Sequence, residues 1–135
     1  MDKNVMTKKI LRTAAILGAL AVGLGAFGAH GLKKQLTAEE LSVFETGVRY
    51  HFYHVFALLF TGLFYIQHPS KQVSVAALCF EIGIVLFSGS LYLMTALKAG
   101  GSVGISGIGL ITPIGGLFFV AGWLLLAFAV HKTLS

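Results

Sequence analysis

The sequence predicts an all-α integral membrane protein, a bundle of four transmembrane helices with a short amphipathic interfacial helix between the first two, in a single domain over residues 1–135. Two observations support this prediction. Hydrophobic residues make up 56% of the chain and charged residues only 11%, and the mean hydropathy is +0.86, which is outside the range of soluble domains. Four apolar runs are each close to the roughly 20 residues that a helix needs to cross a bilayer.

The first apolar run covers residues 10–30 and follows a basic cluster made up of Lys3, Lys8, Lys9 and Arg12. It is longer than the roughly 7–15 apolar residues of a signal peptide, so we expect it to remain as a membrane helix. Ala15, Ala19 and Gly23 recur every four residues along it. Small residues at this spacing let helices approach closely in lipid, which favours a homo-oligomer or a membrane-protein partner.

A polar segment follows, within which we predict a helix over residues 37–48. Thr37 and Glu40 have the spacing of a capping box, and Leu36 and Leu41 supply the hydrophobic staple across it. Apolar residues then fall on one face of the helix and acidic residues elsewhere. We expect this amphipathic helix to lie along the membrane interface before it leads into the second span.

The second span is predicted over residues 50–66 and has two distinct faces, because a helix advances by about 100° per residue. One face carries Tyr50, His51, His54, Leu58, Thr61 and Tyr65. The opposite face carries Phe52, Phe56, Leu59, Phe60 and Leu63. Polar groups are costly against hydrocarbon, so we expect the first face to pack against protein and the second to meet lipid. The span ends before Pro69, which favours a turn.

The third span is predicted over residues 73–97 and carries a polar residue every seven positions: Ser74, Glu81, Ser88 and Thr95. We expect this stripe to face protein. A glycine-rich loop at residues 100–107 separates it from the fourth span, residues 108–130. Pro113 lies near the start of that span, where proline is tolerated, and Gly115 and Gly122 allow close helix packing.

The distribution of Lys and Arg predicts the orientation of the spans. With both termini on one side, that side carries six basic residues (Lys3, Lys8, Lys9, Arg12, Lys71, Lys132) and the other carries four (Lys33, Lys34, Arg49, Lys98). We therefore expect a multi-pass protein of the cell inner membrane with both termini in the cytoplasm. The ten basic residues exceed the five acidic ones and give a net charge of +5, and we expect the basic residues to meet anionic membrane lipids and no nucleic acid.

Counting about 1.5 Å per residue from the helix ends places polar residues of all four spans at one level near the outer leaflet. This candidate ligand-binding cluster consists of His30, Arg49, Tyr50, His51, His54, Ser88, Ser90, Tyr92 and Thr112. Three interpretations stay open. The residues are ordinary interfacial groups satisfied by backbone, water and nearby glutamates; they form a pocket for an anionic lipid or a small polar metabolite; or they hold a metal or haem.

The metal interpretation is the least favoured. His51 and His54 can share a metal because they are three residues apart, and His30 can add a ligand. Two histidines on one helix cannot occupy opposite faces of one haem, so a bis-histidine haem would need His30 or a second subunit. We therefore expect no metal and no cofactor.

Glu81 lies far from both ends of the third span, at a deeper level that also holds Trp123. A carboxylate in hydrocarbon is costly and a protonatable one can relay protons, so Glu81 is a candidate proton relay. The alternative is a structural glutamate hydrogen-bonded by Ser88, Thr61 or the Trp123 indole. The sequence has no defensible catalytic triad, phosphate-binding loop or paired acidic motif, and we expect no enzymatic activity.

Four motifs occur together in order: GAFGAHG at 25–31, FETGVRYHFYH at 44–54, FSGSLY at 87–92 and TPIGG at 112–116, the last followed by Gly122-Trp123. In these the chain resembles the YgdD/YwdK-like family of small four-helix bacterial membrane proteins of unknown function, which has eukaryotic transmembrane relatives. The resemblance implies the four-helix fold and no particular activity. It marks the polar cluster as distinctive of the family, and Glu81 is not part of the pattern.

The sequence thus favours a non-enzymatic inner-membrane protein that binds a lipid, a small ligand or a membrane partner through the polar cluster. One alternative is a proton-coupled small-molecule transporter that acts as an oligomer through Glu81. Another is an accessory subunit of a larger membrane complex.

Overall fold

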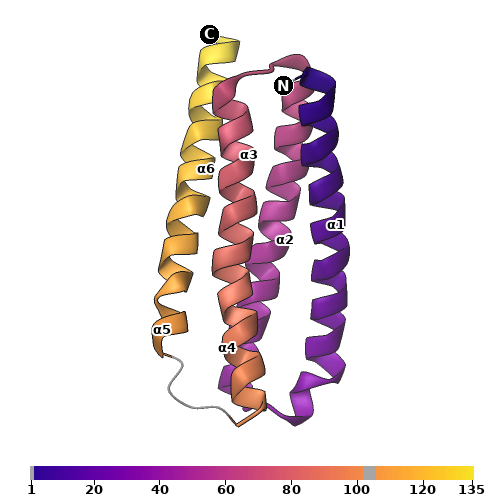
Figure 1. Cartoon of the computed structure of the whole chain (residues 1–135), viewed down its shortest axis with the longest axis vertical. Coiled ribbons are helices and arrows are strands. Elements are labelled where there is room, and N and C mark those ends of the chain that lie inside the picture. The colour runs from indigo at the N-terminus through magenta and orange to yellow at the C-terminus, as the bar shows by residue number, and fades with distance from the viewer. Residues whose placement is uncertain (1, 102–105) are drawn as a thin grey trace.

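Four helical rods lie side by side in the computed structural model, which describes residues 2–101 and 106–135 (Figure 1). The first two rods are α1 (Lys3–His30) and α2 (Ala38–Gln67), joined through a short turn, η1 (Leu32–Lys34). The third rod is α3 (Lys71–Gly83), a π-helical turn η2 (Ile84–Ser88) and α4 (Gly89–Ala99). The fourth is α6 (Ile111–Leu134), preceded by the short α5 (Ser106–Gly109). The all-helical class predicted from the sequence is confirmed.

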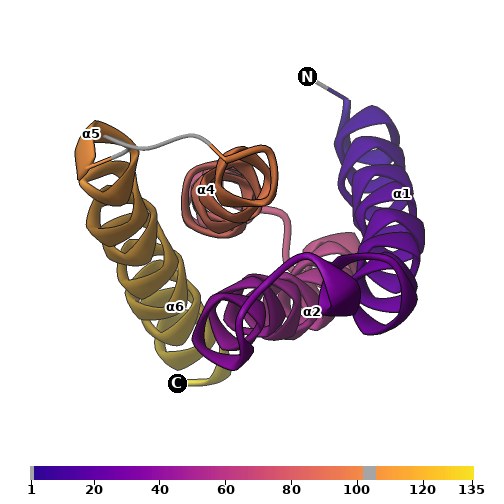
Figure 2. The same ribbon diagram turned by 90° about the horizontal axis from the view of Figure 1, so that it is seen from below.

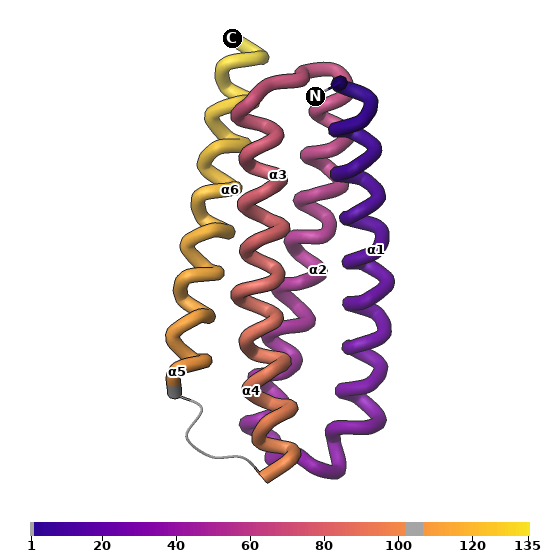
Figure 3. The backbone as a smooth tube through the Cα atoms, viewed as in Figure 1, coloured from indigo at the N-terminus to yellow at the C-terminus, as the bar shows by residue number. Residues whose placement is uncertain are grey.

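The two termini lie at the same end of the bundle as the turn between α2 and α3, and η1 lies at the opposite end (Figure 3). Each helix extends beyond its predicted span, because the polar residues that flank the apolar runs also adopt helical structure. Of the predicted glycine-rich loop, residues 102–105 lie outside the described part of the chain.

The capping box predicted at the start of the amphipathic segment is present. The Thr37 hydroxyl accepts a hydrogen bond from the backbone N–H of Glu40 at 3.2 Å. The Glu40 carboxylate in turn accepts one from the backbone N–H of Thr37 at 3.0 Å. These two bonds satisfy donors that would otherwise be unpaired at a helix start, so α2 begins at Ala38.

The structure corrects the predicted division between the helix over 37–48 and the span over 50–66. The two segments form one continuous helix, α2. Gly47 does not break it, because there the helix packs tightly against α4: a Cβ at Gly47 would lie 3.0 Å from the Tyr92 ring. The Gly47 carbonyl also accepts a hydrogen bond of 2.7 Å from the Ser88 hydroxyl. An interfacial position for the first turns of α2 stays a prediction.

The predicted inner face of the second span is confirmed, and the outer face is confirmed in part, since Phe52 and Leu59 are only partly exposed and Leu59 packs against the core. The inner face is buried at His51, His54, Leu58, Thr61 and Tyr65. The opposite face exposes Phe56, Phe60 and Leu63, each by more than half. Tyr50 departs from the prediction, since 38% of its surface remains exposed. It lies at the edge of the buried face, where α2 meets a groove described below.

The π-helical turn η2 interrupts the polar stripe predicted along the third span. The backbone N–H of Gly89 bonds to the carbonyl of Ile84, five residues earlier. A turn of this kind is wider than an α-helical turn, so the residues after it are rotated relative to a continuous α-helix. Ser88 and Thr95 are fully buried, whereas Ser74 and Glu81 remain partly exposed.

The close packing predicted for the glycines of the fourth span is confirmed. A Cβ at Gly115 would lie 2.3 Å from the backbone nitrogen of Phe87 in η2, and one at Gly122 would lie 2.7 Å from the Phe80 ring in α3. Both glycines therefore allow α6 to pack closely against the third rod of the same chain. Small residues of α1 face outward instead: Ala15, Ala19 and Gly23 are exposed.

Seen along the bundle, α1 and α6 lie on opposite sides, with α2 and the third rod between them (Figure 2). α1 packs mainly on α2, and α6 packs mainly on α3 and η2. The shared core contains Ile10, Leu58, Phe80, Phe119 and Leu126. This arrangement leaves the flanks of α2 and α6 facing each other without extensive contact.

Three segments in the described part of the chain are long and apolar enough to cross a membrane: Lys3–Lys34, Lys71–Ala99 and Gly107–Leu134. The α2 helix is not among them. Its inner face carries His51, His54 and Thr61, and these polar side chains lower its average hydropathy although its outer face is apolar.

Candidate functional site

His51 and His54 lie on the buried face of α2 but contact different neighbours. Three residues advance a helix by about 300°, which leaves the two side chains about 60° apart on the buried face, enough to reach different helices. His51 bonds to Tyr92 of α4, and His54 bonds to Trp123 of α6. The two histidines, predicted to belong to one cluster, therefore link α2 to two different helices.

Both ring nitrogens of His54 form hydrogen bonds within the protein. Nδ1 lies 2.7 Å from the carbonyl oxygen of Tyr50, and since a carbonyl only accepts, Nδ1 carries the proton. Nε2 accepts a hydrogen bond from the indole N–H of Trp123 at 3.1 Å. The Phe119 ring stacks on the imidazole with centroids 3.5 Å apart and planes 6° apart. Use of His54 as a metal or haem ligand would break one of these bonds.

His51 is the most buried member of the predicted cluster after Ser88, with 2% of its surface exposed. Its Nδ1 lies 2.8 Å from the Tyr92 hydroxyl. Its Nε2 is buried and has no hydrogen-bond partner among the described residues. Together with the bond from Ser88 to Gly47, the His51–Tyr92 pair ties the middle of α2 to the third rod.

Ser90 and Thr112 join the third rod to α6. Their hydroxyl oxygens lie 2.6 Å apart. The Ser90 hydroxyl donates to the Phe87 carbonyl at 2.8 Å, so its proton is engaged and Thr112 is the donor between the two side chains. This bond holds the start of α6 beside η2.

A groove of about 570 Å³ lies between α2 and α6. Residues of α2 form one wall, residues of α6 form the other, and Phe87 of η2 joins the two. Its lining residues are Tyr50, Tyr53, His54, Phe87, Pro113, Gly116, Leu117, Phe119, Val120 and Trp123. Most are aromatic or aliphatic, and of those in the described part of the chain none carries a formal charge. Tyr53 and Trp123 are each about half exposed, so the groove opens on the outside of the bundle.

The comparisons with known proteins agree with the resemblance seen in the four motifs. A family model described as "Protein of unknown function (DUF423)" matches residues 24–116. The chain belongs to the DUF423 family. All four motifs, at 25–31, 44–54, 87–92 and 112–116, lie within the matched segment.

Relatives of this DUF423 protein are similar over nearly the whole chain. The UPF0382 membrane protein YwdK of Bacillus subtilis (strain 168) is 42% identical over 129 residues, which are 94% of this chain and 99% of the relative. The UPF0382 membrane protein of Haemophilus influenzae is 40% identical over 130 residues, 96% of this chain and 99% of the relative. The UPF0382 inner membrane protein YgdD of Escherichia coli (strain K12) is 37% identical over 116 residues, 84% and 82% of the two chains. No solved structure matches the chain. The DUF423 protein is a helical membrane protein.

The DUF423 structure separates two members of the predicted cluster from the groove. His30, at the end of α1, and Arg49 are both exposed. Arg49 lines a smaller hollow of about 300 Å³ between α1 and α2, together with Glu45, Gly25 and Gly28. Of the predicted ligand-binding residues, only Tyr50 and His54 line the groove itself. A ligand in the groove therefore does not meet the arginine on which an anionic-lipid pocket would depend.

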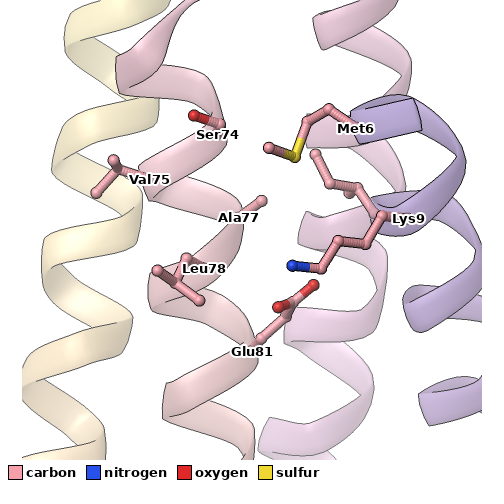
Figure 4. Close-up of a pocket in the computed structure, with 8 residues that line it drawn as sticks. Met6, Lys9, Ser74, Val75, Ala77, Leu78 and Glu81 are labelled. Atoms are coloured by element: carbon pink, nitrogen blue, oxygen red, sulfur yellow. The ribbon is translucent and has the colours of Figure 1, made fainter. Parts of the chain in front are cut away.

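Glu81 of the DUF423 protein lies apart from both sites, in a cavity of about 150 Å³ between α1 and α3. The Lys9 ammonium group points toward the Glu81 carboxylate (Figure 4). The three predicted hydrogen-bonding partners of Glu81 are engaged elsewhere: Thr61 donates to Ala57, Ser88 to Gly47 and Trp123 to His54. The structural alternative for Glu81 was therefore wrong about its neighbours, because depth along each helix does not specify which way a side chain points.

Most of the groove, including Phe87, Phe119 and Trp123, lies outside the cluster predicted from the sequence. A signal for the α6 wall exists: Pro113, Gly116, Val120 and Trp123 recur at intervals of three or four residues and so share one face of a helix. The sequence placed Trp123 at the level of Glu81. In the DUF423 structure it meets His54 instead.

Proposed function

We propose that this DUF423 protein is a non-enzymatic protein of the inner membrane that takes up a small apolar or amphipathic molecule from the bilayer into the groove between α2 and α6. The observation that carries the proposal is the groove itself. Its volume of about 570 Å³ falls within the roughly 300–1,000 Å³ of typical small-molecule sites, and such sites are mostly apolar with a few placed polar groups.

The walls of the groove are held in place without a ligand. The Trp123–His54 bond and the Phe119–His54 stack set the position of three lining side chains. The Ser90–Thr112 bond holds the start of α6. A preorganised site binds with less loss of conformational entropy than one that must order on binding.

We also propose that the chain crosses the membrane four times, with α2 as the second span. The outward face of α2 is apolar along Phe56, Phe60 and Leu63, and its polar groups turn inward and mostly find partners. The relative YgdD is named an inner membrane protein, and the excess of basic residues on the side of the termini favours cytoplasmic termini. The lining residues of α6 belong to its first half, so in this orientation the groove lies in the outer half of the bilayer.

Native mass spectrometry after gentle extraction from the membrane tests the proposal. We expect the protein to retain an apolar molecule and to lose it in Gly116→Leu. A Cβ at Gly116 would lie 3.8 Å from Phe87, an ordinary contact, so the leucine side chain fills the groove without displacing the backbone. The control is Gly23→Leu, since a Cβ at Gly23 meets nothing within 4 Å. A molecule retained equally by both variants would contradict the proposal.

Proton-coupled transport by an oligomer is the second candidate, favoured by the Glu81 carboxylate beside Lys9 at the α1–α3 cavity (Figure 4). Ionisable groups inside membrane segments commonly mark proton or ion pathways. The test is proton uptake by proteoliposomes in response to a substrate gradient, which Glu81→Gln should abolish. Uptake unchanged in Glu81→Gln would remove this candidate.

A further inference from the structure

The chemistry of the groove restricts which class of lipid-soluble molecule can occupy it; this inference rests on the function proposed above. The lining residues in the described part of the chain carry no formal charge. A charged headgroup buried there would lose its hydration without gaining a counter-charge, which is costly in a low-dielectric site. The occupant is therefore electrically neutral.

The groove offers the exposed parts of the Tyr50, Tyr53 and Trp123 rings, and the more buried rings beneath them pack on one another. Phe87 packs against Tyr50 with ring centroids 4.7 Å apart and against Phe119 at 5.4 Å, and Phe119 stacks on His54. Aromatic rings gain most from contact with other planar π systems in offset or edge-on geometry. A planar ring system matches this surface better than a flexible acyl chain does.

The hydrogen-bonding groups available to an occupant are hydroxyls, which can donate as well as accept. Both nitrogens of His54 are already engaged, as is the indole N–H of Trp123. Two phenolic hydroxyls remain, those of Tyr50 and Tyr53, which line the groove. A hydroxyl donates readily to a carbonyl oxygen, so a planar ring that carries carbonyl groups can bond to them.

Part of the open side of the groove is aliphatic. Leu117 and Val120 line it and are 69% and 55% exposed. On a membrane helix this rim faces hydrocarbon. A long apolar tail attached to the ring can therefore lie along α6 and continue into the bilayer.

From these four properties we propose that the groove binds a quinone-type lipid, a neutral planar ring with carbonyl acceptors and an isoprenoid tail. The ring lies among Tyr50, Phe87 and Trp123, with its carbonyl groups toward the tyrosine hydroxyls. The tail leaves over Leu117 and Val120. The proposal concerns binding and includes no electron transfer.

Trp123 is the single tryptophan of the chain and lines the groove, so its fluorescence reports on binding. The purified full-length protein in nanodiscs is titrated with a naphthoquinone that carries a short isoprenoid tail. Two probes are compared with it: the isoprenoid alcohol of the same tail, and phosphatidylglycerol. We expect saturable quenching by the quinone, and displacement of the quinone by neither comparison probe.

Variants assign the quenching to the groove. Gly116→Leu should raise Kd about tenfold or more because the leucine side chain occupies part of the site, and Gly23→Leu should leave Kd unchanged. The double variant Tyr50→Phe/Tyr53→Phe should raise Kd by about fivefold for each lost hydrogen bond, and so by roughly 30-fold in total. Its control is Tyr65→Phe, because Tyr65 is buried elsewhere on α2.

The outcomes separate this inference from the function on which it rests. If the alcohol displaces the quinone at equal concentration, the groove binds lipids without regard to the ring, and the quinone class is overturned while the proposed function stands. If quenching is not saturable, or is equal in Gly116→Leu, the quinone does not bind in the groove and the inference fails. The native mass spectrometry experiment then tests the proposed function independently of the quinone titration.

Discussion

The indole N–H of Trp123 donates to Nε2 of His54 across 3.1 Å, although the two residues are 69 positions apart. This bond connects α2 to α6 on one side of the groove, beside the stack of Phe119 on His54. It also engages the second nitrogen of a histidine of which only 4% is exposed.

Replacement of Trp123 by Phe should destabilise the bundle. His54 keeps its bond to Tyr50 but its buried Nε2 loses its donor, and an unsatisfied buried acceptor costs about 1–3 kcal/mol. Unfolding in detergent, followed by circular dichroism, measures the change. A double-mutant cycle with His54→Phe should show coupling of at least about 0.5 kcal/mol; additive effects would show that the bond contributes nothing to stability.

Two neighbouring glycines should respond oppositely to alanine. In Gly115→Ala the new Cβ would lie 2.3 Å from the Phe87 backbone nitrogen, which forces α6 away from η2 and should cost about 1–3 kcal/mol. In Gly116→Ala the nearest atom would be 3.8 Å away, and the better helix propensity of alanine should stabilise the helix slightly. Thermal unfolding measures the melting temperatures of both variants, and we expect Gly115→Ala to melt lower. Equal melting temperatures would contradict the packing described for η2.

Removal of the Tyr92 hydroxyl should also destabilise the protein. In Tyr92→Phe, His51 loses the hydrogen bond of 2.8 Å at Nδ1, and its Nε2 has no partner among the described residues. The buried imidazole then loses its hydrogen bond to the third rod, which should cost about 1–3 kcal/mol. Chemical unfolding compares this variant with Tyr65→Phe, which removes a hydroxyl elsewhere on the inner face of α2. A loss of unfolding free energy no larger than in Tyr65→Phe would show that the His51–Tyr92 bond is not stabilising.

The attraction between Lys9 and Glu81 should appear as a coupling energy. Lys9→Met should destabilise the protein by a few tenths to about 1 kcal/mol, the range for partly exposed ion pairs. In a Glu81→Gln background the same change should have no cost, because the carboxylate that Lys9 faces is gone. Equal effects in the two backgrounds, measured by unfolding in detergent, would show that the side chains do not interact.

Thiol labelling in sealed right-side-out vesicles should report the path of α2. Cys79 is the only cysteine and is replaced by Ala to give a silent background. A cysteine at Gln35, before α2, should react with a membrane-impermeant maleimide. Cysteines at Gln67, at the end of α2, and at Ser135 should react only after permeabilisation. Reaction of the Gln35 and Gln67 variants from the same side would show that α2 does not cross.

Much of the fold could be predicted from the sequence because the relevant signals are local. Composition identifies a membrane protein, the Thr37–Glu40 spacing identifies a helix start, and the period of His51, His54, Leu58 and Thr61 identifies a buried face. Each of these depends on residues within a few turns of one another. The same reasoning found that Gly115 and Gly122 serve close packing, although not which side chains they meet.

The partners of the polar residues could not be predicted in this way. A helix rotates by about 100° and rises by about 1.5 Å with each residue, so a small error in rotation or offset pairs the wrong side chains. The π-helical turn at 84–88 adds a further rotation within the third rod, and no sequence pattern predicts this turn. Arg49 consequently lies outside the groove, and Trp123 lies within it.

The membrane class, the helical segments and the inward face of α2 can all be predicted from the amino-acid sequence. The packing of the helices determines that His51 and His54 separate toward α4 and α6, that Glu81 faces Lys9, and that an uncharged aromatic groove forms between α2 and α6. The physical reason is that burial follows from the periodicity of a single helix, whereas a site between helices depends on their relative rotation, offset and spacing.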